Sequence, residues 1–256
     1  MINKNTIDKI SETIKFEFKD SEVIFLSGSL IENIGNKFSD LDIFIIVEDT
    51  SNITLTDYDY NYKELKIKFK EYIGVKCDIE IYNKNLIEKN IEILNNVRID
   101  DKRILNIFSG IETNIFLSFI HRMITGKCIK GKESYQDFLS KINLQKYFSI
   151  LQKLYQNQIE NYYDDLVGNF YKKNYMTTIM IGNLLLPTLI AYFLAKKEVT
   201  IDRVKWAHIK LEILSIKDKE SKEFLIKINS FLLGKLQKEV YAKQLILLVN
   251  KILEGS

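Results

Sequence analysis

The chain has 256 residues, of which 46% are apolar and 28% charged, and its formal net charge is +3. This length predicts one large domain or two modest ones with a sizeable core, and the composition is that of an ordinary globular protein. The small net charge gives no argument for a nucleic-acid or membrane partner. With only two cysteines and two histidines, the sequence argues against a disulfide framework and a His-rich zinc site, and favours a reducing compartment.

The first part of the chain combines helix and strand patterns. Apolar residues at helical spacing predict a helix over 6–18, and short β-branched runs predict strands over 22–27 and 42–47. Lysines that alternate with apolar residues predict a half-exposed strand over 63–70, and 75–82 is predicted as the next strand. Because the first twenty residues lack the apolar core of a signal peptide, we expect a cytoplasmic protein.

From about residue 112 the pattern is helical to the end. The segment Met176–Ala195 carries no charge and is long enough to cross a bilayer. It also contains Asn183 and Pro187, and no second such segment follows. We therefore interpret it as a buried helix inside a bundle, with a transmembrane helix as the alternative.

The change of pattern predicts two domains. Residues 1–112 combine strands and helices, whereas 113–256 are helical throughout. This division predicts an α+β chain, in which an N-terminal domain with a sheet precedes a C-terminal helical bundle.

Four acidic residues are placed at matching positions on two predicted strands. Asp40 and Asp42 lie at the start of one strand, and Asp78 and Glu80 repeat the spacing on the other. Residues two apart on a strand share a face. If the strands are neighbours, the carboxylates converge, and their repulsion would raise their pKa values unless a cation is bound. Carboxylate oxygens are ligands of Mg²⁺, so we predict a magnesium site, with Glu80 either an outer carboxylate or an exposed residue.

Gly28 and Ser29 end the first predicted strand, and a short helix over 30–34 would follow them. Backbone N–H groups at a helix N-terminus bind phosphate oxygens, and glycine lets the backbone approach a phosphate closely. Taken alone, such a pair is an ordinary turn. Together with the carboxylates it describes phosphoryl or nucleotidyl transfer with two metal ions.

The same residues resemble a known family. Gly28 and Ser29, followed by Ser-Asp-Leu-Asp at 39–42 and Asp-Ile-Glu at 78–80, are similar to the signature of the nucleotidyltransferase superfamily of DNA polymerase beta. The resemblance covers residues 22–82. It implies an N-terminal nucleotidyltransferase fold, which is a mixed sheet with flanking helices.

For the site, the resemblance implies that Gly28 and Ser29 hold a nucleoside triphosphate (NTP). It further implies two Mg²⁺ ions, both bound by Asp40 and Asp42. Asp78 would bind the catalytic ion and help to deprotonate the attacking hydroxyl group.

The helical half resembles the antibiotic nucleotidyltransferases more loosely, through residues 121–139 and 199–211. This resemblance implies a substrate-binding domain and transfer of a nucleoside monophosphate (NMP) to a hydroxyl of a small molecule similar to an aminoglycoside or lincosamide, with release of pyrophosphate. Lys205 resembles a lysine that binds the triphosphate; the alternative is a surface lysine. The alternative functions are NMP transfer to a protein or tRNA, and a non-catalytic nucleotide-binding module.

Further polar residues have two interpretations each. Glu160, Asp164 and Asp165 could supply a general base or bind the acceptor, or they form a solvated helix face. His121 and Arg122 on an apolar helix are interpreted as structural, although Arg122 could reach a phosphate. The sequence identifies neither the acceptor nor the preferred NTP, and it leaves open whether the protein is a homodimer.

Overall fold

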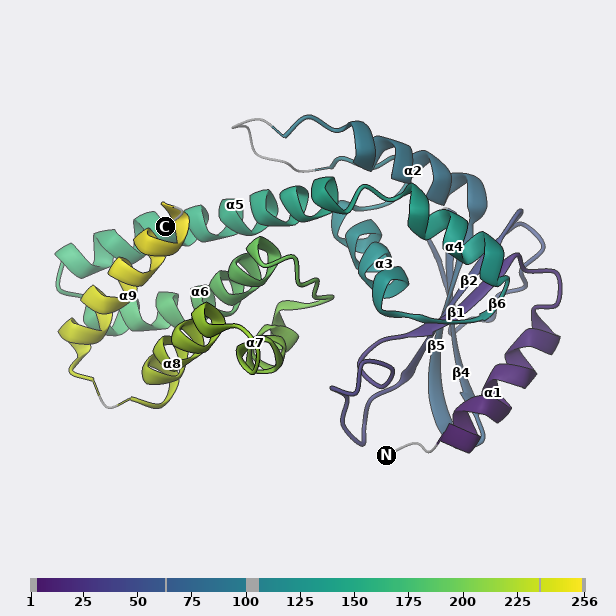
Figure 1. Cartoon of the computed structure of the whole chain (residues 1–256), viewed down its shortest axis with the longest axis horizontal. Coiled ribbons are helices and arrows are strands. Elements are labelled where there is room, and N and C mark those ends of the chain that lie inside the picture. Colours follow the sequence, from purple (N-terminus) through teal and green to yellow (C-terminus); the bar gives the residue numbers. More distant parts are fainter. Residues whose placement is uncertain (1–3, 63, 100–105, 235, 255–256) are drawn as a thin grey trace. The chain divides into compact units, whose positions relative to one another are not determined.

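The computed structural model describes residues 4–62, 64–99, 106–234 and 236–254. The chain divides into two compact units (Figure 1). The first extends to Tyr147, and most of the second consists of the residues from Phe148 onward. The first unit contains the sheet, and the second is helical.

The first unit contains a mixed sheet of six strands in the order β3-β4-β5-β2-β1-β6. Strands β2 and β5 are parallel, and the other neighbouring pairs are antiparallel. The predicted mixed sheet with flanking helices is therefore confirmed. The elements of this unit are α1 (Lys4–Glu17), β1 (Val23–Ser27), β2 (Leu41–Val47), β3 (Tyr60–Tyr62), β4 (Leu65–Tyr72), β5 (Val75–Asn83), α2 (Lys84–Asn96), α3 (Thr113–Thr125), β6 (Lys127–Lys130) and α4 (Lys132–Lys141).

The two faces of the sheet have different cores, with α1 and α3 on opposite sides (Figure 1). Ile10 and Ile14 of α1 pack against aliphatic side chains of β1, β2 and β5. On the other face, the rings of Phe25 and Phe44 stack at 5.0 Å, and Phe119 of α3 lies 6.3 Å from Phe44. Side chains alternate between faces along a strand, so each central strand contributes to both cores.

Two strands of the sheet were not predicted from the sequence. β3 is only three residues long, and β6 follows α3 after a single glycine, Gly126. Because β6 pairs with β1, the first compact unit continues beyond the boundary predicted at residue 112. The assignment of 1–112 as catalytic and 113–256 as substrate-binding stays a prediction. Residue 63, the first of one predicted strand, lies outside the described residues, as do 1–3, 100–105, 235 and 255–256 of the two predicted domains.

The prediction of a helix over 30–34 is wrong. The backbone N–H groups of Ile34 and Gly35 both donate to the carbonyl oxygen of Ser29, at 2.9 and 2.8 Å. Asn33 has a φ of 58°, which interrupts a right-handed helix. The segment is thus a compact turn that folds back on Ser29.

The second unit is built around an apolar helix, α6. Among the described residues, α6 is the helix that is long and apolar enough to cross a membrane, but 67% of its most apolar window is buried. Gly182 of α6 lies against Leu245, and the Tyr241 hydroxyl donates to Asn183 Oδ1 at 3.0 Å. These contacts favour the buried-helix interpretation. The elements are α5 (Leu144–Tyr171), α6 (Tyr175–Lys196), the 3₁₀ helix η1 (Val204–Trp206), α7 (Ala207–Ser215), α8 (Lys219–Leu233) and α9 (Lys238–Leu253).

Candidate functional site

The predicted carboxylates meet on one face of the sheet. Asp42 of β2 is the direct partner of Asp78 on β5, and two residues further along Phe44 is the partner of Glu80. Partners on neighbouring strands point to the same face, so these three acids share it. Glu80 accepts a hydrogen bond of 2.5 Å from the Tyr82 hydroxyl, which anchors it to the aromatic core.

Gly28 lies directly beside the Asp42 carboxylate. It follows Ser27, which is the partner of Asp42 in the β1–β2 pair. Its φ is +89°, and a Cβ added there would lie 1.8 Å from Asp42 Oδ2 and 2.5 Å from Nη1 of Arg122. Both the backbone conformation and the available space therefore require glycine. Gly28 and the Asp42 carboxylate are therefore immediate neighbours; that the Gly28–Ser29 turn and the carboxylates act as one binding site stays a prediction.

The cation that contacts Asp42 in this structure is Arg122. Its Nη1 donates to Asp42 Oδ2 at 3.0 Å, and the two side chains are only 10% and 20% exposed. The guanidinium carbon also lies 5.8 Å from the centre of the Phe44 ring. The sequence analysis predicted a cation at this carboxylate but expected a metal ion. The sequence feature that could have identified Arg122 is its position as a basic residue in the last turn of an apolar helix.

The last turn of α3 makes two further contacts around this site. His121 Nε2 lies 3.1 Å from Glu32 Oε1, and these side chains are 1% and 8% exposed. The hydroxyl groups of Thr125 and Ser27 lie 3.3 Å apart. One helical turn therefore fixes the ends of β1 and β2 and the turn between them.

Asp40 and Asp78 line a surface pocket of about 460 Å³ next to the paired carboxylates. Phe69, the partner of Asp78 on β4, also lines the pocket and is 45% exposed. Burial, followed by the negative charge of Asp78, raises the pKa of Cys77 in the wall to about 12. This raised pKa favours the protonated thiol at neutral pH. The remaining lining residues are Lys70, Glu71 and Lys76.

The donor set is chemically suited to a hard cation. Asp42 and Asp78 present carboxylates from neighbouring strands, and the missing side chain of Gly28 makes room for the Asp42 carboxylate. Such oxygen donors are the ligands of Mg²⁺. In the described parts of the chain, however, no group of three or more His, Cys, Asp or Glu side chains is arranged to hold a metal ion. A metal here would use Asp42 and Asp78 first; the participation of Asp40 and the number of ions stay predictions.

The remaining predicted site residues belong to the second unit. Lys205 is exposed in η1, with its Nζ 5.1 Å from the centre of the Trp206 ring. Glu160 accepts a hydrogen bond of 2.8 Å from a glutamine one turn earlier, and Asp164 and Asp165 are also exposed on α5. This exposure agrees with the interpretation as a solvated helix face. Roles in catalysis or acceptor binding stay predictions.

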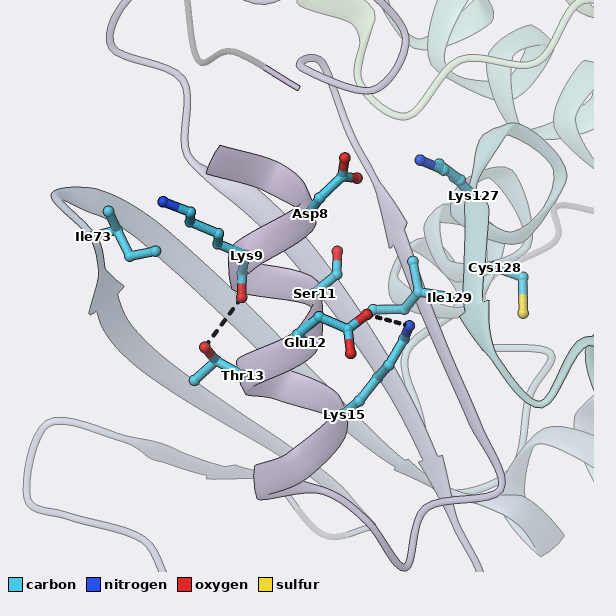
Figure 2. Close-up of a pocket in the computed structure, with 10 residues that line it drawn as sticks. All are labelled: Asp8, Lys9, Ser11, Glu12, Thr13, Lys15, Ile73, Lys127, Cys128 and Ile129. Atoms are coloured by element: carbon cyan, nitrogen blue, oxygen red, sulfur yellow. Dashed lines mark hydrogen bonds and ion pairs between the residues drawn. The ribbon is translucent and has the colours of Figure 1, made fainter. Parts of the chain in front are cut away.

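A larger hollow of about 770 Å³ lies beside α1 and β6 (Figure 2). Its wall includes an ion pair of 2.8 Å between Glu12 and Lys15 and a hydrogen bond of 3.1 Å from the Thr13 hydroxyl to the carbonyl of Lys9. None of the predicted site residues lines it. Since α1 covers the face opposite Asp42, this hollow is separate from the candidate site.

A comparison with known protein families matches the part of the chain that contains the predicted carboxylates. Residues 7–104 match the family described as nucleotidyltransferase domain, and this range includes Gly28, Asp40, Asp42 and Asp78. The search of curated proteins found no match.

Among solved structures, the chain is similar to a nucleotidyltransferase-like protein from Exiguobacterium sibiricum. The two are 12% identical, with a TM-score of 0.52, over 97% of this chain and 75% of the other. At this identity the likeness shows a common fold.

Proposed function

We propose that the chain, whose residues 7–104 match the nucleotidyltransferase domain family, is an enzyme that transfers NMP from an NTP to a hydroxyl of a small molecule. The reaction would depend on Mg²⁺ and release pyrophosphate. The observation that carries this proposal is the placement of Asp42 opposite Asp78, with Gly28 against the Asp42 carboxylate.

The residues of the proposed site have different roles. Although no helix follows it, the Gly28–Ser29 turn would bind the phosphates through backbone N–H groups of the turn and the serine hydroxyl. Mg²⁺ held by Asp40, Asp42 and Asp78 would supply Lewis-acid stabilisation of the phosphate charge.

Asp78 would accept the proton of the acceptor hydroxyl. The hydroxyl oxygen then bonds to the α-phosphorus, and the bond from that phosphorus to the pyrophosphate oxygen breaks.

The pocket beside Asp78 supports a small-molecule acceptor. Its volume of about 460 Å³ is in the range of pockets for small molecules. Its wall carries Glu71, Lys70 and Lys76 beside the proposed metal-binding residues Asp40 and Asp78, and these charged groups would orient a polar, hydroxylated compound similar to an aminoglycoside or lincosamide. We also place the reaction in the cytoplasm, which supplies NTP.

Two alternatives remain to be compared with this proposal. Transfer to a protein or tRNA uses the same chemistry, but the net charge of +3 gives no particular support for an RNA acceptor. A non-catalytic nucleotide-binding module would not need Asp40, Asp42 and Asp78 together, and the chain has all three.

The test is a transfer assay with each NTP labelled at the α-phosphate, Mg²⁺, and a panel of aminoglycosides, lincosamides, proteins and tRNA. We expect label on a small molecule together with an equal amount of released pyrophosphate. Label on protein or tRNA would overturn the acceptor class. Nucleotide binding without any pyrophosphate release would favour the binding module.

A further inference from the structure

We propose that Arg122 acts as a resident counter-ion of Asp42, which keeps divalent ions from binding there until an NTP enters the site. Metal and nucleotide would then bind together rather than in sequence. The inference rests on the proposed function, because it takes Asp42 as a carboxylate that binds the metal.

The first argument is the position of the charge. Arg122 Nη1 lies 3.0 Å from Asp42 Oδ2, and both side chains are largely shielded from water. Guanidinium is charged at every physiological pH. A divalent ion at the same carboxylate would be repelled by this charge, and the repulsion is stronger in a shielded site than in water. Divalent ions alone therefore bind Asp42 weakly.

The second argument is that Arg122 is held in place. The Phe44 ring lies 5.8 Å from its guanidinium carbon. The α3 turn that carries Arg122 is fixed by the contact of 3.1 Å between His121 and Glu32. Its carbonyl at Met123 also accepts a hydrogen bond from the Tyr135 hydroxyl. The ion pair is therefore a built part of the site, unlike an exposed pair whose side chains move freely.

The third argument is that Arg122 also borders the phosphate-binding turn. Its Nη1 is only 2.5 Å from the position of a Cβ on Gly28. A guanidinium group has five N–H donors and binds phosphate oxygens in a fork. A phosphate group at the Gly28–Ser29 turn would give Arg122 a second anionic partner. The Arg122 guanidinium then interacts with the phosphate as well as with Asp42, so its interaction with Asp42 weakens. The phosphates also supply additional negative charge that attracts the metal ion.

This arrangement predicts two effects of opposite sign when Arg122 is replaced. Arg122→Gln removes the competing charge, so Asp42 should bind a divalent ion more tightly in the absence of nucleotide. The same change removes a phosphate contact, so the NTP should bind more weakly. A purely structural role of Arg122 would weaken both.

The experiment uses the full chain and Mn²⁺, whose binding is measured by electron paramagnetic resonance without nucleotide. We expect Arg122→Gln to bind Mn²⁺ at least about tenfold more tightly than the original protein and Arg122→Lys to stay close to it. The matched control is Arg203→Gln, which removes the same charge from a side chain that is 68% exposed and should change nothing. Equal or weaker Mn²⁺ binding by Arg122→Gln overturns the inference.

The companion measurement is calorimetry with the nonhydrolysable α,β-methylene analogues of ATP, GTP, CTP and UTP in saturating Mn²⁺. Arg122→Gln should bind the preferred analogue at least about tenfold more weakly, and unchanged affinity overturns the phosphate contact. If the original protein binds none of the four analogues, the proposed function fails. If it binds one and Arg122→Gln gains no Mn²⁺ affinity, only the role of Arg122 fails.

Should Arg122→Gln not fold, the original protein still tests the proposal. Mn²⁺ alone should raise its melting temperature by less than a quarter of the shift produced by Mn²⁺ with the analogue. A shift with Mn²⁺ alone that matches the shift with both would contradict it.

Discussion

The two faces of the sheet in the first unit have different tasks, although the same strands build both. On the α1 face, β2 and β5 contribute Ile43 and Ile79, which are fully buried among aliphatic side chains. On the α3 face, the neighbouring positions are Asp42 and Asp78, at the edge of an aromatic core. Alternation along a strand thus places the aliphatic core and the acids of the candidate site one residue apart. Substitutions of the buried aliphatic residues on the α1 face should change stability, and substitutions of the acids on the α3 face should change activity.

The largest effect is expected for Asp42→Asn on the α3 face. A neutral amide cannot replace the negative charge that binds a cation, and asparagine has the same shape. We expect nucleotidyl transfer to fall at least about 1,000-fold, or ~4 kcal/mol of transition-state stabilisation. Circular dichroism and the melting temperature should show a folded protein. Activity within about tenfold of the original would show that Asp42 is not a metal ligand.

The opposite behaviour is expected for Ile14→Ala on the α1 face. Ile14 is 0% exposed, and truncation of a buried isoleucine costs about 2–5 kcal/mol because it leaves a cavity. Urea unfolding should show this loss, while the turnover of the folded fraction stays within about twofold. Phe16→Ala on the same helix is the control, since Phe16 is 84% exposed. A large loss of turnover without loss of stability would remove the distinction between the faces.

Gly28→Ala tests how closely the Gly28–Ser29 turn approaches the Asp42 carboxylate. A Cβ there would lie 1.8 Å from Asp42 Oδ2, whereas nothing lies within 4 Å of a Cβ on Gly74. Both glycines have positive φ, so Gly74→Ala carries the same kind of backbone strain without the contact. We expect transfer to fall about 100-fold, or ~2.7 kcal/mol, for Gly28→Ala and to stay nearly unchanged for Gly74→Ala. Similar activities for the two variants would mean that strain alone matters.

The smallest effect is expected outside both faces, on α5. If Glu160 and Asp164 orient a cationic acceptor, Glu160→Gln with Asp164→Asn should raise the acceptor KM about threefold to tenfold, without a change in NTP affinity. Steady-state kinetics with the acceptor identified by the transfer assay measures this. An unchanged KM would leave these exposed residues as a solvated helix face.

Local patterns were sufficient to predict the central strands and the acids they carry. The alternation around Asp42 and around Asp78 is visible in the sequence, so their common face followed once the strands were taken as neighbours. The resemblance to the nucleotidyltransferase superfamily, which depended on the same residues, is confirmed. The assignment to the antibiotic-modifying type stays a prediction.

The contacts that the sequence did not reveal join distant segments. Arg122 lies eighty residues from Asp42 in the chain, and no local pattern relates them. β6 has four residues and is recognised as a strand by its pairing with β1. The 28–35 turn is shaped by Asn33 and by contacts of Glu32 with α3, which override its helical pattern. Tertiary contacts, rather than propensity, determine these features.

The central claim is that the carboxylates on the α3 face bind an NTP through a divalent ion. The most direct test is calorimetric titration of the original protein and of Asp42→Asn with each NTP, in Mg²⁺ and in EDTA, without acceptor. The account predicts that the original protein binds one NTP at least about tenfold more tightly in Mg²⁺ than in EDTA, and that Asp42→Asn loses this difference. Equal affinity in Mg²⁺ and EDTA for the original protein would contradict it.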